Sequence, residues 1–233
     1  FDNDTFSYEE DIKILENVNL HVKPGETIAL VGPTGAGKTT IINLITRFYD
    51  VTGGSVKIDG NDVRKVTLES LREEVGVLMQ VPFIFKGSVM ENIRYGRLDA
   101  TDGECINAAK YIYADEFIER LPNGYDEELE ERGEGLSAGE KQLISFARII
   151  LKNPSVIILD EATSSIDTET ENMIQKALDV ILSEKTAFIV AHRLSTIRNA
   201  DRILYIADKG IAEEGNHEEL MEKKGLYYRL NVR

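Results

Sequence analysis

The segment that decides the fold is Thr27-Ile-Ala-Leu-Val-Gly-Pro-Thr-Gly-Ala-Gly-Lys-Thr39. Its first five residues, 27–31, form a continuous run of mostly apolar side chains, which is typical of a β-strand buried on both faces. Three glycines follow within six positions, and apolar residues then recur at helical spacing from Thr40 to Phe48. The sequence therefore predicts a buried strand, a glycine-rich turn and a helix in direct succession.

Short apolar runs alternate with longer helical patterns along the rest of the chain. Further core strands are expected at residues 75–79, 156–159, 186–191 and 203–206. Shorter strands in 1–23 and 54–60 suit an antiparallel sheet, and helical patterns dominate 81–154, at 88–93, 106–121 and 138–151. We predict an α/β fold with a largely parallel sheet: a core at 1–80 and 155–233 with an antiparallel β subdomain, and a helical subdomain inserted at 81–154.

The composition narrows the classes of function. The 233 residues include 41 acidic and 27 basic side chains, a formal net charge of −14. Such a chain lacks the clustered cations that follow a nucleic-acid backbone, so no nucleic-acid partner is expected. Cys105 is the single cysteine, which excludes an internal disulfide, and the longest apolar runs are far too short to cross a bilayer.

Residues Gly32 to Thr39 fit the pattern G-x-x-x-x-G-K-S/T in the strand–turn–helix context that supports it. The glycines let the backbone N–H groups form an anion-binding nest, and the helix that follows adds its positive end. Lys38 supplies a charge for the β- and γ-phosphates, and the Thr39 hydroxyl is a hard ligand for Mg²⁺. We predict a P-loop NTPase (RecA-like) core that binds ATP and Mg²⁺. The expected ATP contacts in this loop are Gly32, Pro33, Thr34, Gly35, Ala36, Gly37, Lys38, Thr39 and Thr40.

Two carboxylates end the apolar run at 156–159. Asp160 can hold Mg²⁺ beside the phosphate loop, directly or through water. Glu161 can position the attacking water as a general base. Acidic residues also commonly cap the helix that follows a strand, which remains an alternative for both. The phosphate loop upstream favours the catalytic interpretation.

The stretch Leu136-Ser137-Ala138-Gly139-Glu140 resembles the signature motif of ATP-binding cassette (ABC) ATPases, which lies in the helical insertion of that family. In ABC dimers the signature closes over the ATP held by the opposite subunit, so two sites form at a head-to-tail interface. The resemblance therefore implies that Leu136 to Glu140 act on a partner's ATP, and that a second ABC nucleotide-binding domain is a partner.

Other landmarks of the family follow in the expected order. Tyr8 resembles the aromatic residue that stacks on adenine, and Gln80 resembles the glutamine that contacts Mg²⁺ or water. Ser164-Ser165-Ile166-Asp167 resembles the D-loop, and His192 resembles the histidine that contacts the γ-phosphate. Taken alone, Tyr8 would be an aromatic residue packed on the sheet and Gln80 a surface polar residue. The resemblance implies that Lys38, Gln80, Glu161 and His192 are catalytic, and that Thr39, Gln80 and Asp160 hold the metal.

Three segments are similar to ABC exporters in particular, namely Val81–Ile93, Glu131–Gly133 and Gly215–Tyr228. In exporters this domain is fused to, or associates with, a membrane-spanning domain, and ATP-driven dimerisation powers translocation of the substrate. The resemblance thus implies an ATPase at the cytoplasmic face of the inner or plasma membrane. We expect Phe1 to follow a segment that leads from the membrane-spanning domain.

The signature departs from the family pattern at two positions, where Ala138 replaces a glycine and Glu140 replaces a glutamine. Ser137 and Glu140 also fit a capping box at the start of a helix. The charge of Glu140 should repel a partner's γ-phosphate. The chain's own Lys38 and Glu161 are intact, so we expect one half of a heterodimer: a competent site here, and an altered signature that closes over a slow or inactive partner site.

Two alternative functions remain. One is a soluble ABC ATPase that acts on DNA or ribosomes, and the other is a regulatory domain that binds ATP without hydrolysing it. The chain lacks the long coiled-coil insertions of DNA-repair members, and Glu161 and His192 argue against a binding-only domain. A GTPase interpretation fails because no Asn-Lys-x-Asp motif is present.

Overall fold

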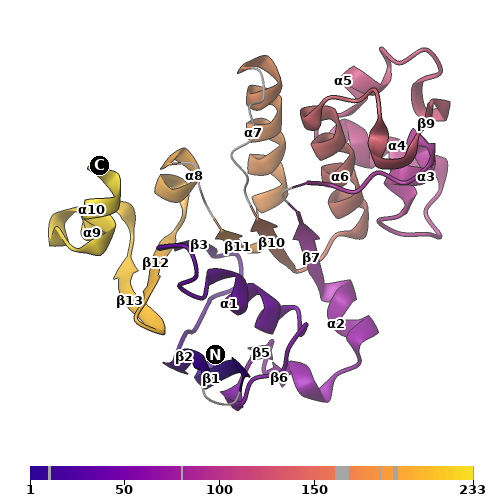
Figure 1. The fold of residues 1–233 in the computed structure, drawn as a ribbon. Coiled ribbons are helices and arrows are strands. Elements are labelled where there is room, and N and C mark those ends of the chain that lie inside the picture. Colours follow the sequence, from indigo (N-terminus) through magenta and orange to yellow (C-terminus); the bar gives the residue numbers. More distant parts are fainter. Residues whose placement is uncertain (10–11, 80, 161–167, 184, 191–193, 233) are drawn as a thin grey trace. The chain divides into compact units, whose positions relative to one another are not determined.

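The computed structural model describes residues 1–9, 12–79, 81–160, 168–183, 185–190 and 194–232 (Figure 1). These residues form two compact units. The first holds the described residues within 1–75, 156–161 and 184–233, and the second holds those within 76–155 and 162–183.

A twisted sheet forms the centre of the first unit. The strands that the first unit contributes to this sheet are β3 (Thr27–Val31), β10 (Val156–Asp160), β11 (Thr186–Val190), β12 (Arg202–Ala207) and β13 (Gly210–Gly215). They lie in the order β13-β12-β3-β11-β10 (Figure 1), and every pair is parallel except the hairpin of β12 and β13. Strands β3, β10 and β11 are buried along almost their whole length, which explains why each is a nearly continuous apolar run, and β12 combines buried with partly buried residues.

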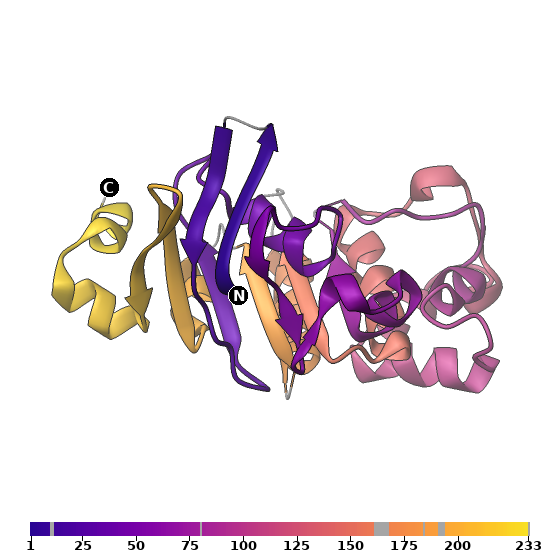
Figure 2. The same ribbon diagram turned by 90° about the horizontal axis from the view of Figure 1, so that it is seen from below.

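A second, antiparallel sheet belongs to the same unit and is seen in Figure 2. Its strands are β1 (Asp2–Glu9), β2 (Ile12–Val18) and β4 (Gly53–Ser55), in the order β2-β1-β4. Helix α1 (Lys38–Ile45) joins the two sheets through one apolar core, because Ile41 and Leu44 pack in a cluster with Leu15 of β2 and with Ile28 and Leu30 of β3. The remaining elements of the unit are β5 (Lys57–Ile58), β6 (Asn61–Asp62), α2 (Leu68–Glu74), α8 (Leu194–Asn199), α9 (His217–Lys223) and α10 (Leu226–Asn231).

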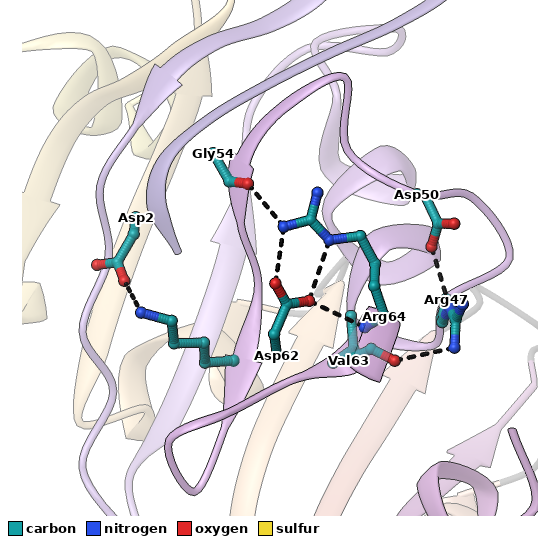
Figure 3. A network of polar contacts seen from close by, with 8 residues as sticks. Asp2, Arg47, Asp50, Gly54, Asp62, Val63 and Arg64 are labelled. Atoms are coloured by element: carbon teal, nitrogen blue, oxygen red, sulfur yellow. Dashed lines mark hydrogen bonds and ion pairs between the residues drawn. The ribbon is translucent and has the colours of Figure 1, made fainter. Parts of the chain in front are cut away.

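Polar contacts fix the chain that follows α1 (Figure 3). The Arg47 guanidinium donates to the carbonyl oxygen of Val63 at 3.0 Å and to that of Val66 at 3.1 Å. Arg64 bonds the Asp62 carboxylate at 2.7 Å and the Gly54 carbonyl at 3.0 Å. Residues 46–50 are therefore tied to the chain at 53–66.

Helices dominate the second unit. Its helices are α3 (Val89–Arg94), α4 (Asp102–Tyr111), α5 (Asp115–Ile118), α6 (Ala138–Lys152) and α7 (Thr168–Leu182). Its strands are β7 (Val75–Leu78) and the two-residue strands β8 (Gly87–Ser88) and β9 (Glu128–Leu129). Val75, the first residue of β7, still belongs to the first unit. The central helix α6 contacts α3, α4 and α7. None of the helices in the described part of the chain is long and apolar enough to cross a membrane.

Most predicted elements are present, with shifted ends. The strand predicted at 27–31 matches β3, whereas α1 begins at Lys38, two residues before the predicted start, because Gly37 takes a left-handed conformation (φ 109°) and caps it. Arg47 is also left-handed (φ 54°), and the helix ends before it. The helix predicted at 106–121 is wrong as a single element, because Tyr113 (φ 63°) separates α4 from α5.

Candidate functional site

The phosphate loop connects β3 to α1 with the backbone curl that its glycines permit. Gly32, Gly35 and Gly37 have φ values of 139°, 80° and 109°, which side chains rarely adopt. A methyl group at Gly32 would overlap the carbonyl oxygen of Ile206 on β12. Gly37 caps α1 without any side-chain hydrogen bond, and the first turn of α1 contains no acidic residue. The positive start of this helix is thus available to an anion.

Lys38 points its amine back at the loop. The Nζ atom donates to the carbonyl oxygens of Gly32 at 2.7 Å and Pro33 at 2.8 Å. Partial burial lowers the pKa of this amine. The ammonium group therefore lies over the loop, where a bound phosphate would replace carbonyl oxygens as its partner. The next side chain, Thr39, is exposed, and Thr40 is buried.

Asp160 lies at the same edge of the sheet as the phosphate loop. It is the last residue of β10 and pairs with Val190 of β11, which in turn pairs with Leu30 of β3. Leu30, two residues before Gly32, is therefore level with Asp160 across the sheet. Carboxyl ends of neighbouring parallel strands are where ligands bind in such sheets. The Asp160 carboxylate and the Thr39 hydroxyl are both hard oxygen ligands, which suits Mg²⁺.

Tyr8 lies near the end of β1 in the same unit. Its ring makes edge contacts with Phe6 and Tyr49, as the packing interpretation predicted, yet 47% of the residue remains exposed. Its hydroxyl lies 3.2 Å from Oγ1 of Thr40 and accepts a hydrogen bond from Asn43 at 3.3 Å. Asn43 and Tyr49 were not predicted from the sequence as neighbours of Tyr8. The only signal for Asn43 was its spacing of three residues from Thr40 on the predicted helix.

Several predicted site residues lie outside the described residues. These are Gln80, Glu161, Ser164, Ser165, Ile166, Asp167 and His192. Of the described ones, the phosphate loop, Tyr8 and Asp160 belong to the first unit, and the signature belongs to the second.

The signature residues open helix α6. Ser137 is the N-cap: its Oγ accepts from the Glu140 amide at 3.2 Å, and the Glu140 carboxylate accepts from the Ser137 amide at 2.8 Å. The predicted capping box is thus confirmed. Leu136 is partly buried and Ala138 is exposed, whereas Gly139 is buried against Thr170 of α7, where a methyl group would overlap. The Glu140 carboxylate is therefore drawn back over its own helix start.

Comparisons with known proteins identify the relatives of this chain. The sequence pattern of the ABC transporter family matches residues 15–164. The chain is 54% identical, over 97% of its length and 38% of the relative's, to the uncharacterized ABC transporter ATP-binding protein YknV of Bacillus subtilis. It is 49% identical, over 98% of its length and 38% of the relative's, to the ATP-dependent lipid A-core flippase of Syntrophus aciditrophicus.

Among solved structures, a bacterial Atm1-family ABC exporter with ATP bound superposes with a TM-score of 0.91 at 43% identity, over 100% of this chain and 41% of the other. The predicted fold class, a P-loop NTPase core with an antiparallel β subdomain and an inserted helical subdomain, is thereby confirmed. The chain spans about two fifths of the length of the relatives it matches. It belongs to the ABC transporter family.

Proposed function

We propose that this chain binds Mg²⁺-ATP at the phosphate loop, hydrolyses it, and thereby powers export of a substrate across a membrane. The observation that carries the proposal is the start of α1, where Gly37 leaves the helix without a side-chain cap and Lys38 lies over the loop. Uncapped amides, a positive helix end and an ammonium group together favour a polyphosphate. The export class is supported by relatives named as a lipid A-core flippase and as putative multidrug export proteins.

The proposed site residues have different tasks. The backbone amides of the loop hold the phosphates, and Lys38 neutralises the charge that develops on them. Thr39, Asp160 and Gln80 would hold Mg²⁺, which supplies charge neutralisation at the phosphate oxygens when it is bound. Glu161 positions the attacking water, His192 contacts the γ-phosphate, and Tyr8 stacks on the adenine base.

The proposed catalytic role of Glu161 has a direct test. In Glu161→Gln the side chain keeps its size but loses its basicity, so phosphate release from ATP should fall at least about a hundredfold while ATP binding persists. Binding is followed by calorimetry and turnover by phosphate release. Unchanged turnover in Glu161→Gln would remove this residue from catalysis, and absent ATP binding in the folded wild-type chain would remove the whole proposal.

We also propose that the chain works opposite a second, non-identical ABC domain and beside a transmembrane domain, at the cytoplasmic face of the membrane. Within the chain, 81–154 is the proposed helical subdomain that carries the signature. Ser137 Oγ accepts a bond from its own helix, which leaves its O–H able to donate to a partner's phosphate. The Glu140 carboxylate adds a negative charge at the same helix start, which opposes that contact.

The division of labour is tested by Glu140→Gln. Glutamine can still accept the Ser137 amide, so the helix start is retained while the charge is removed. The variant should raise ATP turnover in a mixture with the partner domain and leave ATP binding by the chain's own phosphate loop unchanged. Full activity of the isolated domain, with no change on Glu140→Gln in either setting, would contradict the heterodimer.

A further inference from the structure

The hydroxyl of Tyr8 makes hydrogen bonds with α1, the helix that follows the phosphate loop. Its oxygen lies 3.2 Å from Oγ1 of Thr40, and the Asn43 amide nitrogen donates to it at 3.3 Å. Thr40 and Asn43 are three residues apart on α1, so they share one face of the helix. Thr40 follows Lys38 by two residues. The base-stacking ring and the phosphate-binding helix are thus joined by two side chains.

Aromatic packing restricts the same ring from other directions. The ring centroids of Tyr8 and Phe6 are 4.7 Å apart at an interplanar angle of 89°, and those of Tyr8 and Tyr49 are 4.9 Å apart at 88°. Phe6 and Tyr49 also contact each other, with centroids 5.7 Å apart. These edge-to-face contacts are attractive, and they resist rotation of the Tyr8 ring.

The backbone next to Tyr49 is held in place by hydrogen bonds. Tyr49 lies two residues after Arg47, whose guanidinium holds the carbonyl oxygens of Val63 and Val66. Thr40 is buried, so its hydroxyl cannot easily leave Tyr8 for water. Tyr8 nevertheless keeps 47% of its surface exposed. The ring is therefore ordered before any ligand arrives and remains accessible to one.

We propose that Thr40, Asn43 and Tyr49 are positioning residues that hold the Tyr8 ring at a set distance from the phosphate loop, ready for the base of the nucleotide. The inference rests on the proposed role of Tyr8 in ATP binding. A ring that is already ordered loses less conformational entropy when the base stacks on it. Because Tyr8 of β1 is hydrogen-bonded to α1, geometry that is set in advance also keeps the base and the triphosphate at a fixed separation.

Two substitutions separate this role from stacking alone. Tyr8→Phe keeps the ring and its π-face but removes the hydroxyl, so simple stacking predicts no change in affinity. Anchoring instead predicts that ATP binding weakens about two- to tenfold, the value of one modest hydrogen bond or one newly ordered side chain. Asn43→Ala should have a similar effect without touching the ring. Combined, the two changes should be far from additive, because Tyr8→Phe already removes the hydrogen bond that Asn43→Ala breaks.

The experiment is calorimetric titration of the full chain with ATP, GTP and inorganic tripolyphosphate. Tyr8→Ala calibrates the stacking contribution, with an expected loss of about five- to hundredfold for ATP. Because every base has a π-face, GTP should follow ATP, while tripolyphosphate should bind all variants equally. Thr46→Val is the matched control: its hydroxyl lies at the end of α1 and donates to the backbone carbonyl oxygens of Ile42 at 2.9 Å and Asn43 at 3.3 Å, and it leaves the Asn43 side chain that bonds Tyr8 unchanged.

The outcomes distinguish the two claims. Weaker ATP and GTP binding in Tyr8→Phe and Asn43→Ala, with unchanged tripolyphosphate binding and an unaffected Thr46→Val, supports anchoring. If Tyr8→Ala weakens ATP but Tyr8→Phe and Asn43→Ala do not, anchoring is refuted and stacking stands. An equal loss of affinity for tripolyphosphate in Tyr8→Phe and Asn43→Ala would also refute anchoring, because the substitutions would then act on phosphate binding through α1. No loss in Tyr8→Ala would instead refute the proposed role of Tyr8.

Discussion

The acidic side chain of Asp4 should make the stability of the protein depend on pH. Asp4 lies on β1 opposite Val18 and is fully buried. Neither of its carboxylate oxygens has a hydrogen-bond partner of good geometry among the described residues. Burial raises the pKa of this carboxyl from 3.8 to about 6. The carboxylate of Asp2 adds to that rise, whereas the chain's amino terminus, the Asp2 backbone and Arg64 oppose it.

Proton linkage gives the direction and the size of the change in unfolding free energy with pH. Below about pH 4 the carboxyl is protonated in both the folded and the unfolded chain, and it has no effect on pH dependence. Between about pH 4 and 6 the unfolded chain releases the proton while the folded one keeps it, so stability falls as pH rises. At about 1.4 kcal/mol for each pKa unit, the total loss reaches at most about 3 kcal/mol and is complete above about pH 6.

The assay is urea unfolding of the wild type and Asp4→Asn at intervals from pH 4 to 8. Asparagine cannot ionise, so the variant should gain up to about 3 kcal/mol relative to the wild type across this range, mostly before pH 6. A buried amide adds only an offset that is constant with pH, so the change with pH is the diagnostic quantity. Asp59→Asn, which changes an exposed side chain that does not act on Asp4, is the control and should lack this gain. A difference between Asp4→Asn and wild type that does not vary with pH would refute the reasoning.

Three further substitutions test the fold around the sites. Gly32→Ala places a methyl group against the Ile206 carbonyl at a left-handed φ, so the free energy of unfolding should fall by at least about 1–3 kcal/mol in thermal unfolding. Titration of this variant should show no ATP binding, and a fully stable variant would contradict the close approach. Ser137→Ala removes the N-cap of α6 and should cost about 0.5–2 kcal/mol in urea unfolding, whereas Ser137→Asn should restore most of it. Arg148→Met removes a guanidinium that donates to the backbone and side chain of Asn92, and the unmet acceptors should cost about 1–3 kcal/mol; an unchanged unfolding midpoint would argue against these bonds.

Local features were predictable from the sequence. The phosphate loop, its flanking strand and the capping box of Ser137 and Glu140 depend on residues within a few positions of one another, and the structure has each of them. The ends of α1 were harder to predict, because they depend on left-handed backbone conformations at Gly37 and Arg47. Arg47 carries no sequence signal for that conformation.

Contacts between distant residues were not predictable. Tyr8 and Thr40 are 32 positions apart, and only the packing of the antiparallel sheet against α1 joins them. The burial of Asp4 likewise contradicts the usual exposure of an acidic side chain, and it follows from the pairing of β1 with both β2 and β4. The order of the parallel strands, which brings Asp160 level with Leu30, is also a property of the assembled sheet.

The central claim is that the loop from Gly32 to Thr39 is a Mg²⁺-ATP site, and calorimetric titration of the chain and of Lys38→Met tests it most directly. Methionine keeps the length and apolar stem of the side chain but removes the ammonium group that lies over the loop. Charge-assisted contacts of this kind are worth about 1.5–3 kcal/mol, so ATP affinity should fall about ten- to hundredfold in a Lys38→Met chain that stays folded. Equal ATP affinity in the two proteins, or no binding by the folded wild type, would contradict the claim.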